Sequence, residues 1–218
     1  MVTNNTARGI GYMCLAVTLF PFLNATVKYL GAEYALPQVI WLRYLGHFAL
    51  MLLIFLPFHG RALFRTKNLG AQVVRSLLLL GSTSCYFIAL SYLPLTTAAS
   101  IAFTSPFIVT ALSVPFLGEK VGPRRWAAIC VGFVGAMIII RPGGASFHGA
   151  ELLVVCSTTF YAFFQILTRR LAGQDSAATT IIYTAVFGGI ITSFVGPFYW
   201  VTPTVQFDWV LFAAMGVL

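Results

Sequence analysis

The stretch LPLTTAASIAFTSPFIVTALSVPFLGEK, from Leu93 to Lys120, has the length of a membrane-spanning helix but contains three prolines and seven hydroxyl side chains. Proline lacks a backbone donor and clashes with the preceding helical turn. Of these prolines, Pro106 interrupts the interior of the apolar run. We therefore expect a bent span, with Ser100 and Thr104 beside the break on a face that meets either a solute or a neighbouring helix.

The composition of the whole chain is that of a membrane protein. Apolar residues make up 59% of the 218 residues and charged residues 8%, and the mean hydropathy is +0.91. The apolar runs are about twenty residues long, which suits helices that cross a hydrocarbon core of about 30 Å. They lack the strict alternation of barrel strands. We predict an all-α integral membrane protein, a polytopic helical bundle.

Charged, proline and glycine clusters divide the chain into apolar segments. Seven are long enough to be full spans, at about 9–30, 37–58, 71–92, 95–117, 126–140, 150–168 and 178–199. An eighth begins near Asp208 and reaches about half the length of a span at Leu218. We therefore expect the chain to be a fragment or truncated form of a larger bundle; the alternative is that this last piece is a half-helix.

The net charge of +8 arises from basic residues in short segments between the apolar runs. They form no patch interleaved with aromatic residues, so nucleic acid is not an expected partner. Ten of the thirteen basic residues fall on one side of the bilayer when the N-terminus is cytoplasmic. The positive-inside rule then predicts a multi-pass protein with its N-terminus in the cytoplasm. The membrane we expect is a bacterial inner membrane.

A weak internal repeat appears when the chain is shifted by 142 positions. The shift aligns Phe22 with Phe164, Thr26 with Thr168, Lys28 with Arg170, Gly31 with Gly173 and Gly46 with Gly188. Five spans separate the two copies, so the second copy enters the membrane in the opposite orientation. Inverted repeats of this kind are common in secondary transporters, although chance similarity between apolar helices is the alternative. We assign residues 1–144 to a first repeat of five helices and 145–218 to a partial second repeat.

The stretch ALSYLPLTTAASIAFTSPFIVTALSVPFLGEKVGPRRWAAICVGFVGAMIIIRPGG, from Ala89 to Gly144, resembles the second half of an EamA domain of the drug/metabolite transporter superfamily. It has a hydroxyl- and alanine-rich span with a central proline, an LGEK end and a glycine-rich span that closes with RPGG. The resemblance covers residues 9–141 and continues into the second repeat. It implies two inverted five-helix repeats that move small organic metabolites.

Polar residues inside the spans are the candidates for a solute cavity. Ionisable residues within spans are costly and are functional hypotheses by default, and Arg43 and His47 lie one turn apart in the second span. Asn24 and Gln165 are one position apart under the repeat. The full candidate set is Asn24, Arg43, His47, Tyr86, Ser100, Thr104, Pro106, Tyr161 and Gln165.

Structural explanations compete with this cavity. Arg43 can snorkel to the interface, and the amides, hydroxyls and tyrosines can bond between helices. We interpret Lys28 as an interfacial anchor. Glu119 is either a proton carrier or a partner of Lys120, Arg124 or Arg125.

Two spans carry small residues at four-residue intervals, the pattern of close helix packing. They are Ala128, Gly132 and Ala136 in one span and Ala185, Gly189 and Ser193 in another. Such faces can pack within one chain or in a homodimer.

The leading hypothesis is a secondary transporter or facilitator that moves a small organic metabolite, such as an amino acid, vitamin, nucleoside-like cofactor or drug, by alternating access. The alternative is a truncated, non-transporting assembly subunit. We do not expect an enzyme, because no histidine is placed to activate a nucleophile. The four cysteines are isolated, without metal-binding spacing, so no metal or cofactor is expected. The expected partners are the lipid bilayer and the solute.

Overall fold

The computed structural model describes residues 3–140 and 149–217, and these are predominantly helical. The elements are α1 (Thr3–Glu33), α2 (Leu36–His59), η1 (Gly60–Phe64), α3 (Leu69–Tyr92), α4 (Leu95–Ala102), α5 (Ser105–Leu117), α6 (Pro123–Ile140), α7 (Ala150–Leu171), α8 (Ala177–Ser193), η2 (Gly196–Tyr199) and α9 (Gln206–Val217). The predicted helical class is therefore confirmed. The predicted repeat boundary at 144/145 and the RPGG sequence lie outside the described residues.

Five stretches are long and apolar enough to cross a membrane: Cys14–Glu33, Leu36–Phe58, Leu69–Tyr92, Leu95–Leu117 and Ala150–Leu171. The apolar helices Ala177–Ser193 and Gln206–Val217 are shorter. The region predicted as one span at 178–199 differs from the expectation. Helix α8 ends at Ser193, and η2 follows with Gly196 directly under the side chain of Trp41.

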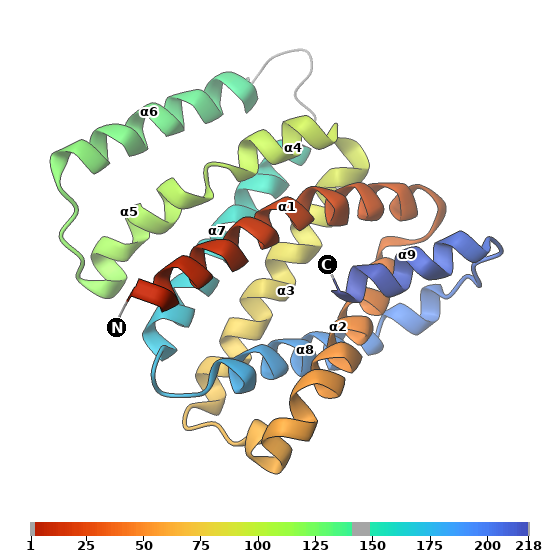
Figure 1. The fold of residues 1–218 in the computed structure, drawn as a ribbon. Coiled ribbons are helices and arrows are strands. Elements are labelled where there is room, and N and C mark those ends of the chain that lie inside the picture. The colour runs from red at the N-terminus through yellow and green to blue at the C-terminus, as the bar shows by residue number, and fades with distance from the viewer. Residues whose placement is uncertain (1–2, 141–148, 218) are drawn as a thin grey trace.

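The centre of the bundle joins helices that are far apart in sequence. Helix α3 packs along α7 and α8, and α2 packs against α8 and α9 (Figure 1). Glycine permits the closest approach, because a Cβ added to Gly216 of α9 would lie 2.7 Å from the carbonyl carbon of Gly46 in α2. Fully buried residues such as Leu30, Leu90 and Met215 fill the core between these helices.

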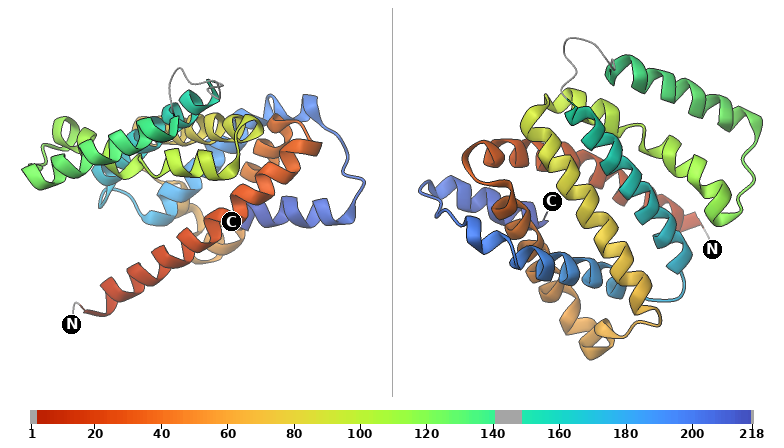
Figure 2. Two further views of the ribbon diagram at one scale, coloured as in Figure 1. Left: turned by 90° about the horizontal axis from the view of Figure 1, so that it is seen from above. Right: turned by 180° about the vertical axis from the view of Figure 1, so that it is seen from behind.

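Two elements lie at the periphery. The N-terminal part of α1 projects away from the other helices, and α6 runs along one edge (Figure 2). Large apolar side chains are exposed here and elsewhere, including Tyr12 at 73% and Val131 at 72%. Exposed apolar side chains in this number suit a surface covered by lipid or another protein, as expected for an integral membrane protein.

The predicted break in the fourth apolar segment is real, but it lies before Pro106. Helix α4 ends at Ala102 and α5 begins at Ser105. Pro106 therefore occupies the first turn of α5, where a missing N–H leaves no helical hydrogen bond unmade. Both the N–H and the hydroxyl of Thr104 bond to the carbonyl of Ile101, at 3.0 and 2.7 Å.

Candidate functional site

Three of the predicted cavity residues lie on three helices that contact one another. They are Asn24 on α1, Arg43 on α2 and Tyr86 on α3. The Asn24 Oδ1, Arg43 Nε and Tyr86 hydroxyl atoms are all buried without a hydrogen-bond partner among the described residues. At 1.5 Å of rise per residue, Asn24 and Tyr86 lie about 14 and 9 Å from the C-terminal ends of α1 and α3, and Arg43 lies about 10 Å from the N-terminal end of α2. Because buried polar atoms without partners are costly, this level of the bundle is the best candidate for solute contact.

Arg43 supplies a cation to this group. Its guanidinium carbon lies 5.6 Å from the ring centroids of both Tyr44 and Phe87, a distance at which the ring faces attract a cation. Arg43 has no ion-pair partner within residues 3–140 and 149–217. The ion pair in this part of the chain joins Glu119 to Arg169. His47 is partly buried one turn further along α2. Arg43 thus remains able to bind an acceptor group.

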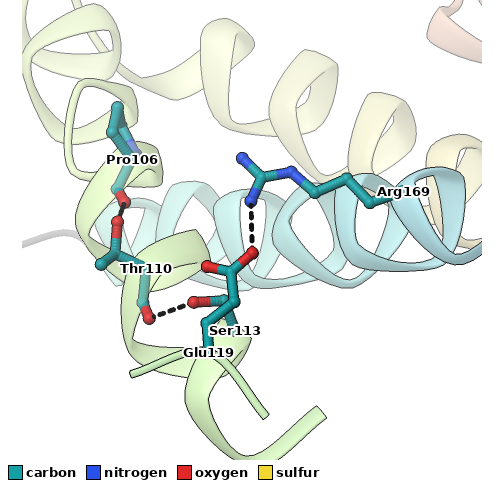
Figure 3. A network of polar contacts seen from close by, with 5 residues as sticks. All are labelled: Pro106, Thr110, Ser113, Glu119 and Arg169. Atoms are coloured by element: carbon teal, nitrogen blue, oxygen red, sulfur yellow. Dashed lines mark hydrogen bonds and ion pairs between the residues drawn. The ribbon is translucent and has the colours of Figure 1, made fainter. Parts of the chain in front are cut away.

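The residues beside the proline break differ from the expectation. Ser100 is partly buried on α4, but the hydroxyl of Thr104 is already bonded to its own chain. The neighbouring Ser105, 8% exposed, has a buried hydroxyl without a partner in the described part of the chain. The exposed Pro106 uses its carbonyl to accept a hydrogen bond from Thr110 at 2.8 Å (Figure 3). Ser105 therefore joins the candidate residues.

The candidates in the second half lie on α7. Tyr161 is 38% exposed, and its ring stacks on Phe164 with centroids 5.7 Å apart. Gln165 is partly buried one turn further on. Their contact with a solute stays a prediction.

The small-residue faces occupy different surroundings. A Cβ on Gly132 would lie 2.2 Å from the ring of Phe107, whereas Ala128 is exposed and Ala136 is buried. Helix α6 therefore packs on α5 through the ring that covers Gly132.

On α8, Ala185 is buried and Ser193 accepts a hydrogen bond from the Trp41 indole at 2.8 Å. Gly189 has open space where a Cβ would stand. The tight position is Gly188, where a Cβ would lie 2.2 Å from the Tyr44 ring. The sequence pattern had favoured Gly189 over Gly188.

Two charged residues have partners other than those expected. Lys28 donates from Nζ to the carbonyls of Leu90 at 3.0 Å and Leu93 at 2.6 Å, so it caps the C-terminal end of α3, where a cation is favoured. Glu119 pairs with Arg169 of α7 at 3.6 Å (Figure 3). Both members of this pair are about half exposed, so it contributes little to stability.

One end of the bundle is closed around a carboxylate in the α7–α8 loop. Asp175 accepts hydrogen bonds from the Thr66 hydroxyl at 2.5 Å, the Lys67 backbone N–H at 3.0 Å and the Gln72 side-chain amide at 2.9 Å. We call these four residues the Asp175 cluster. Desolvation opposes the charge on Asp175, but these hydrogen bonds and the charge of Lys67 outweigh it and lower the pKa of Asp175.

Arg75 reinforces the same end. It is 5% exposed and donates to the Thr168 hydroxyl at 2.7 Å, the Thr180 carbonyl at 2.8 Å and the Thr184 hydroxyl at 2.6 Å. Its guanidinium carbon lies 4.5 Å from the centroid of the Phe164 ring. A single α3 side chain thereby ties α3 to both α7 and α8.

The opposite end of the bundle has a second carboxylate. Asp208, 3% exposed, accepts a hydrogen bond from the Tyr34 hydroxyl at 2.6 Å. This bond to Asp208, with burial and the charge of Asp208, raises the pKa of Tyr34 to about 12. The side-chain amide of Gln38 donates to the carbonyl of Val201 at 2.7 Å and accepts from the backbone N–H of Val201 at 2.9 Å. We call these four residues the Asp208 cluster.

The profile of the EamA-like transporter family matches residues 7–141. The chain therefore belongs to this family of membrane transporters. It is 28% identical to an S-adenosylmethionine uptake transporter of Rickettsia bellii over 90% of this chain and 67% of that relative. It is 28% identical to a riboflavin transporter of Vibrio cholerae over 100% of this chain and 74% of that relative. A pseudopaline exporter of Pseudomonas aeruginosa is 27% identical over 100% of this chain and 76% of its own length. No solved structure matches the chain at a significant level.

Proposed function

We propose that this protein is a secondary transporter or facilitator for a small organic metabolite, and that the solute binds at the level of Asn24, Arg43 and Tyr86. The observation that carries the proposal is the set of buried polar atoms on α1, α2 and α3 that lack partners among the described residues. A bound solute would satisfy them. The relatives named for uptake or export of small metabolites support the same class of solute.

The inverted repeat gives this binding level a mechanism. A shift of 142 positions carries α2 onto α8 and α3 onto α9. The packing of α2 on α9 is then the counterpart of the packing of α3 on α8, which supports two halves that rock against each other around the solute.

The arrangement of charge supports the expected orientation. Lys67 belongs to the Asp175 cluster and Arg65 adjoins it, and Arg169 and Arg170 end α7 near it. By the positive-inside rule this end faces the cytoplasm of a bacterial inner membrane. The Asp208 end then faces outward, and N-terminal α1 starts on the cytoplasmic side.

The surroundings of Arg43 indicate which chemical groups the solute carries. A guanidinium without an ion-pair partner in the described residues binds a carboxylate or another strong acceptor, and the nearby rings of Tyr44 and Phe87 suit an apolar or planar part. The proposed solute therefore combines an acceptor group with an organic body.

Uptake into vesicles tests the function. The purified 218-residue chain is placed in lipid vesicles and supplied with labelled S-adenosylmethionine or riboflavin. We expect accumulation above empty vesicles, lost in Arg43→Gln and retained in Arg124→Gln, which alters an exposed arginine of α6. If neither these solutes nor a broader metabolite mixture enters faster than in empty vesicles, solute movement by this chain is disproved and the assembly-subunit alternative is favoured.

A further inference from the structure

The Asp175 and Asp208 clusters close opposite ends of the same interface. The Asp175 cluster joins the segment between η1 and α3, and the first turn of α3, to the α7–α8 loop, over more than one hundred residues of sequence. The Asp208 cluster joins the α1–α2 region to α9 and the segment before it. Helix α2 runs from one cluster toward the other, and its 24 residues span about 36 Å.

The internal repeat relates the two clusters. A shift of 142 positions carries Thr66 onto Asp208 and carries Tyr34 onto Ser176, the neighbour of Asp175. In each cluster a hydroxyl from the first half bonds to a carboxylate from the second half. The positions that are related by the repeat, Thr66 with Asp208 and Tyr34 with the neighbour of Asp175, are therefore the ones that hold the two halves together.

The two carboxylates are satisfied to different degrees. Both oxygens of Asp175 accept hydrogen bonds, from three donors in all. Asp208 has one donor on Oδ2, and its Oδ1 is buried without a partner in the described part of the chain. A buried oxygen without a donor is costly, and opening would hydrate Asp208 Oδ1 at one end and Gln72 Oε1 at the other. At the Asp175 end, however, opening would also break the bonds to both carboxylate oxygens.

From this geometry we infer that the Asp175 and Asp208 clusters are the paired gates of the transporter, and that the Asp208 gate is the weaker one and opens first. The inference rests on the proposed function for its purpose, but the gate motion is measurable without any solute. In the present structure the bonds of both clusters are made at once, so neither gate is open. Alternating access then requires that the clusters break one at a time.

Spin labels at exposed positions measure each gate directly. In a chain with its four cysteines replaced, one label pair stands at Leu69 and Ala172 beside the Asp175 cluster. A second pair stands at Ala32 and Thr204 beside the Asp208 cluster. Pulsed EPR in a lipid bilayer should give a broader distance distribution for the second pair in the otherwise unaltered chain.

Removal of one donor at each gate provides the matched comparison. Tyr34→Phe removes the donor to Asp208 and should lengthen the distance between labels 32 and 204 alone. Thr66→Val removes one of three donors to Asp175 and should leave both distances unchanged, whereas Asp175→Ala should lengthen the distance between labels 69 and 172 alone. The control is Tyr29→Phe, which removes an exposed hydroxyl from α1, the helix that ends just before Tyr34.

Several results would overturn the inference. They are equal distribution widths at the two ends of the unaltered chain, no response to Tyr34→Phe, or lengthening of both label pairs by a single change. The comparison of widths holds even if Tyr34→Phe does not fold. If the label distances respond as expected but the chain moves no solute, the inference about the two clusters stands and only the proposed function is refuted.

Discussion

The two ends of the bundle use the same chemical groups but are held together unequally. At the Asp175 end, Gln72 and Arg75 reach from α3 to the second half of the chain. At the Asp208 end, the carboxylate has Tyr34 as its single donor among the described residues, and Gln38 adds bonds to the backbone of Val201. Under the proposal of paired gates, this difference biases which of the two ends opens.

The largest expected effect comes from Arg75→Met. This change removes hydrogen bonds to Thr168, Thr180 and Thr184 and leaves buried acceptors behind. We expect a loss of about 3 kcal/mol in the free energy of unfolding, measured by denaturant titration in bicelles. Arg124→Met, at an exposed position, is the control, and an equal effect of the two changes would contradict the importance of the Asp175 end.

A methyl group at the close contact between α8 and α2 should destabilise the bundle without touching either cluster. Gly188→Ala places a Cβ 2.2 Å from the Tyr44 ring, whereas Gly189→Ala meets open space. We expect Gly188→Ala to cost about 2 kcal/mol and Gly189→Ala to be close to neutral in the same titration. A reversed order would show that α2 and α8 do not pack as described.

Asp175→Asn should produce a smaller, pH-dependent loss. The pKa of Asp175 is lowered in the folded protein, so its stabilising effect is present above its unfolded pKa and is lost as the pH falls through the folded pKa. We expect the variant to lose about 1 kcal/mol near pH 7, with the difference from the unaltered chain shrinking below about pH 4. A difference that is constant across this range would mean that the charge of Asp175 does not hold this end.

Glu119→Gln should have the smallest effect. Its ion pair with Arg169 lies near the same end as Arg75, but both side chains are about half exposed. We expect a change of less than about 0.5 kcal/mol in the free energy of unfolding, which thermal unfolding at low and high salt would check. A larger loss would mean that the exposed pair, and not the buried polar groups, holds this end.

The sequence predicted the elements better than the contacts between them. Apolar length gave helices α1, α2, α3 and α7 because this signal is local. A break near Pro106 was expected, but the structure places it before the proline and not at it. Helix α4 ends four residues before Pro106, so the face expected beside the break included Thr104 and left out Ser105.

The residues that hold the two ends of the bundle together were missed for a different reason. Arg75 was interpreted only as a topology signal, and Asp175 was not singled out, because its donors lie more than one hundred residues away. The repeat shift itself could have pointed to them, since it carries Thr66 onto Asp208. Polar partners across two halves depend on packing that no local pattern specifies.

Hydrogen exchange in a lipid bilayer tests the asymmetry of the two ends most directly. The unaltered chain is exposed to deuterated buffer, and exchange is compared between the backbone of residues 200–208 and that of residues 172–176, the two segments that contain Asp208 and Asp175. The account predicts faster exchange at 200–208, because the Asp208 gate opens more often. Equal exchange at both loops, or faster exchange at 172–176, would contradict it.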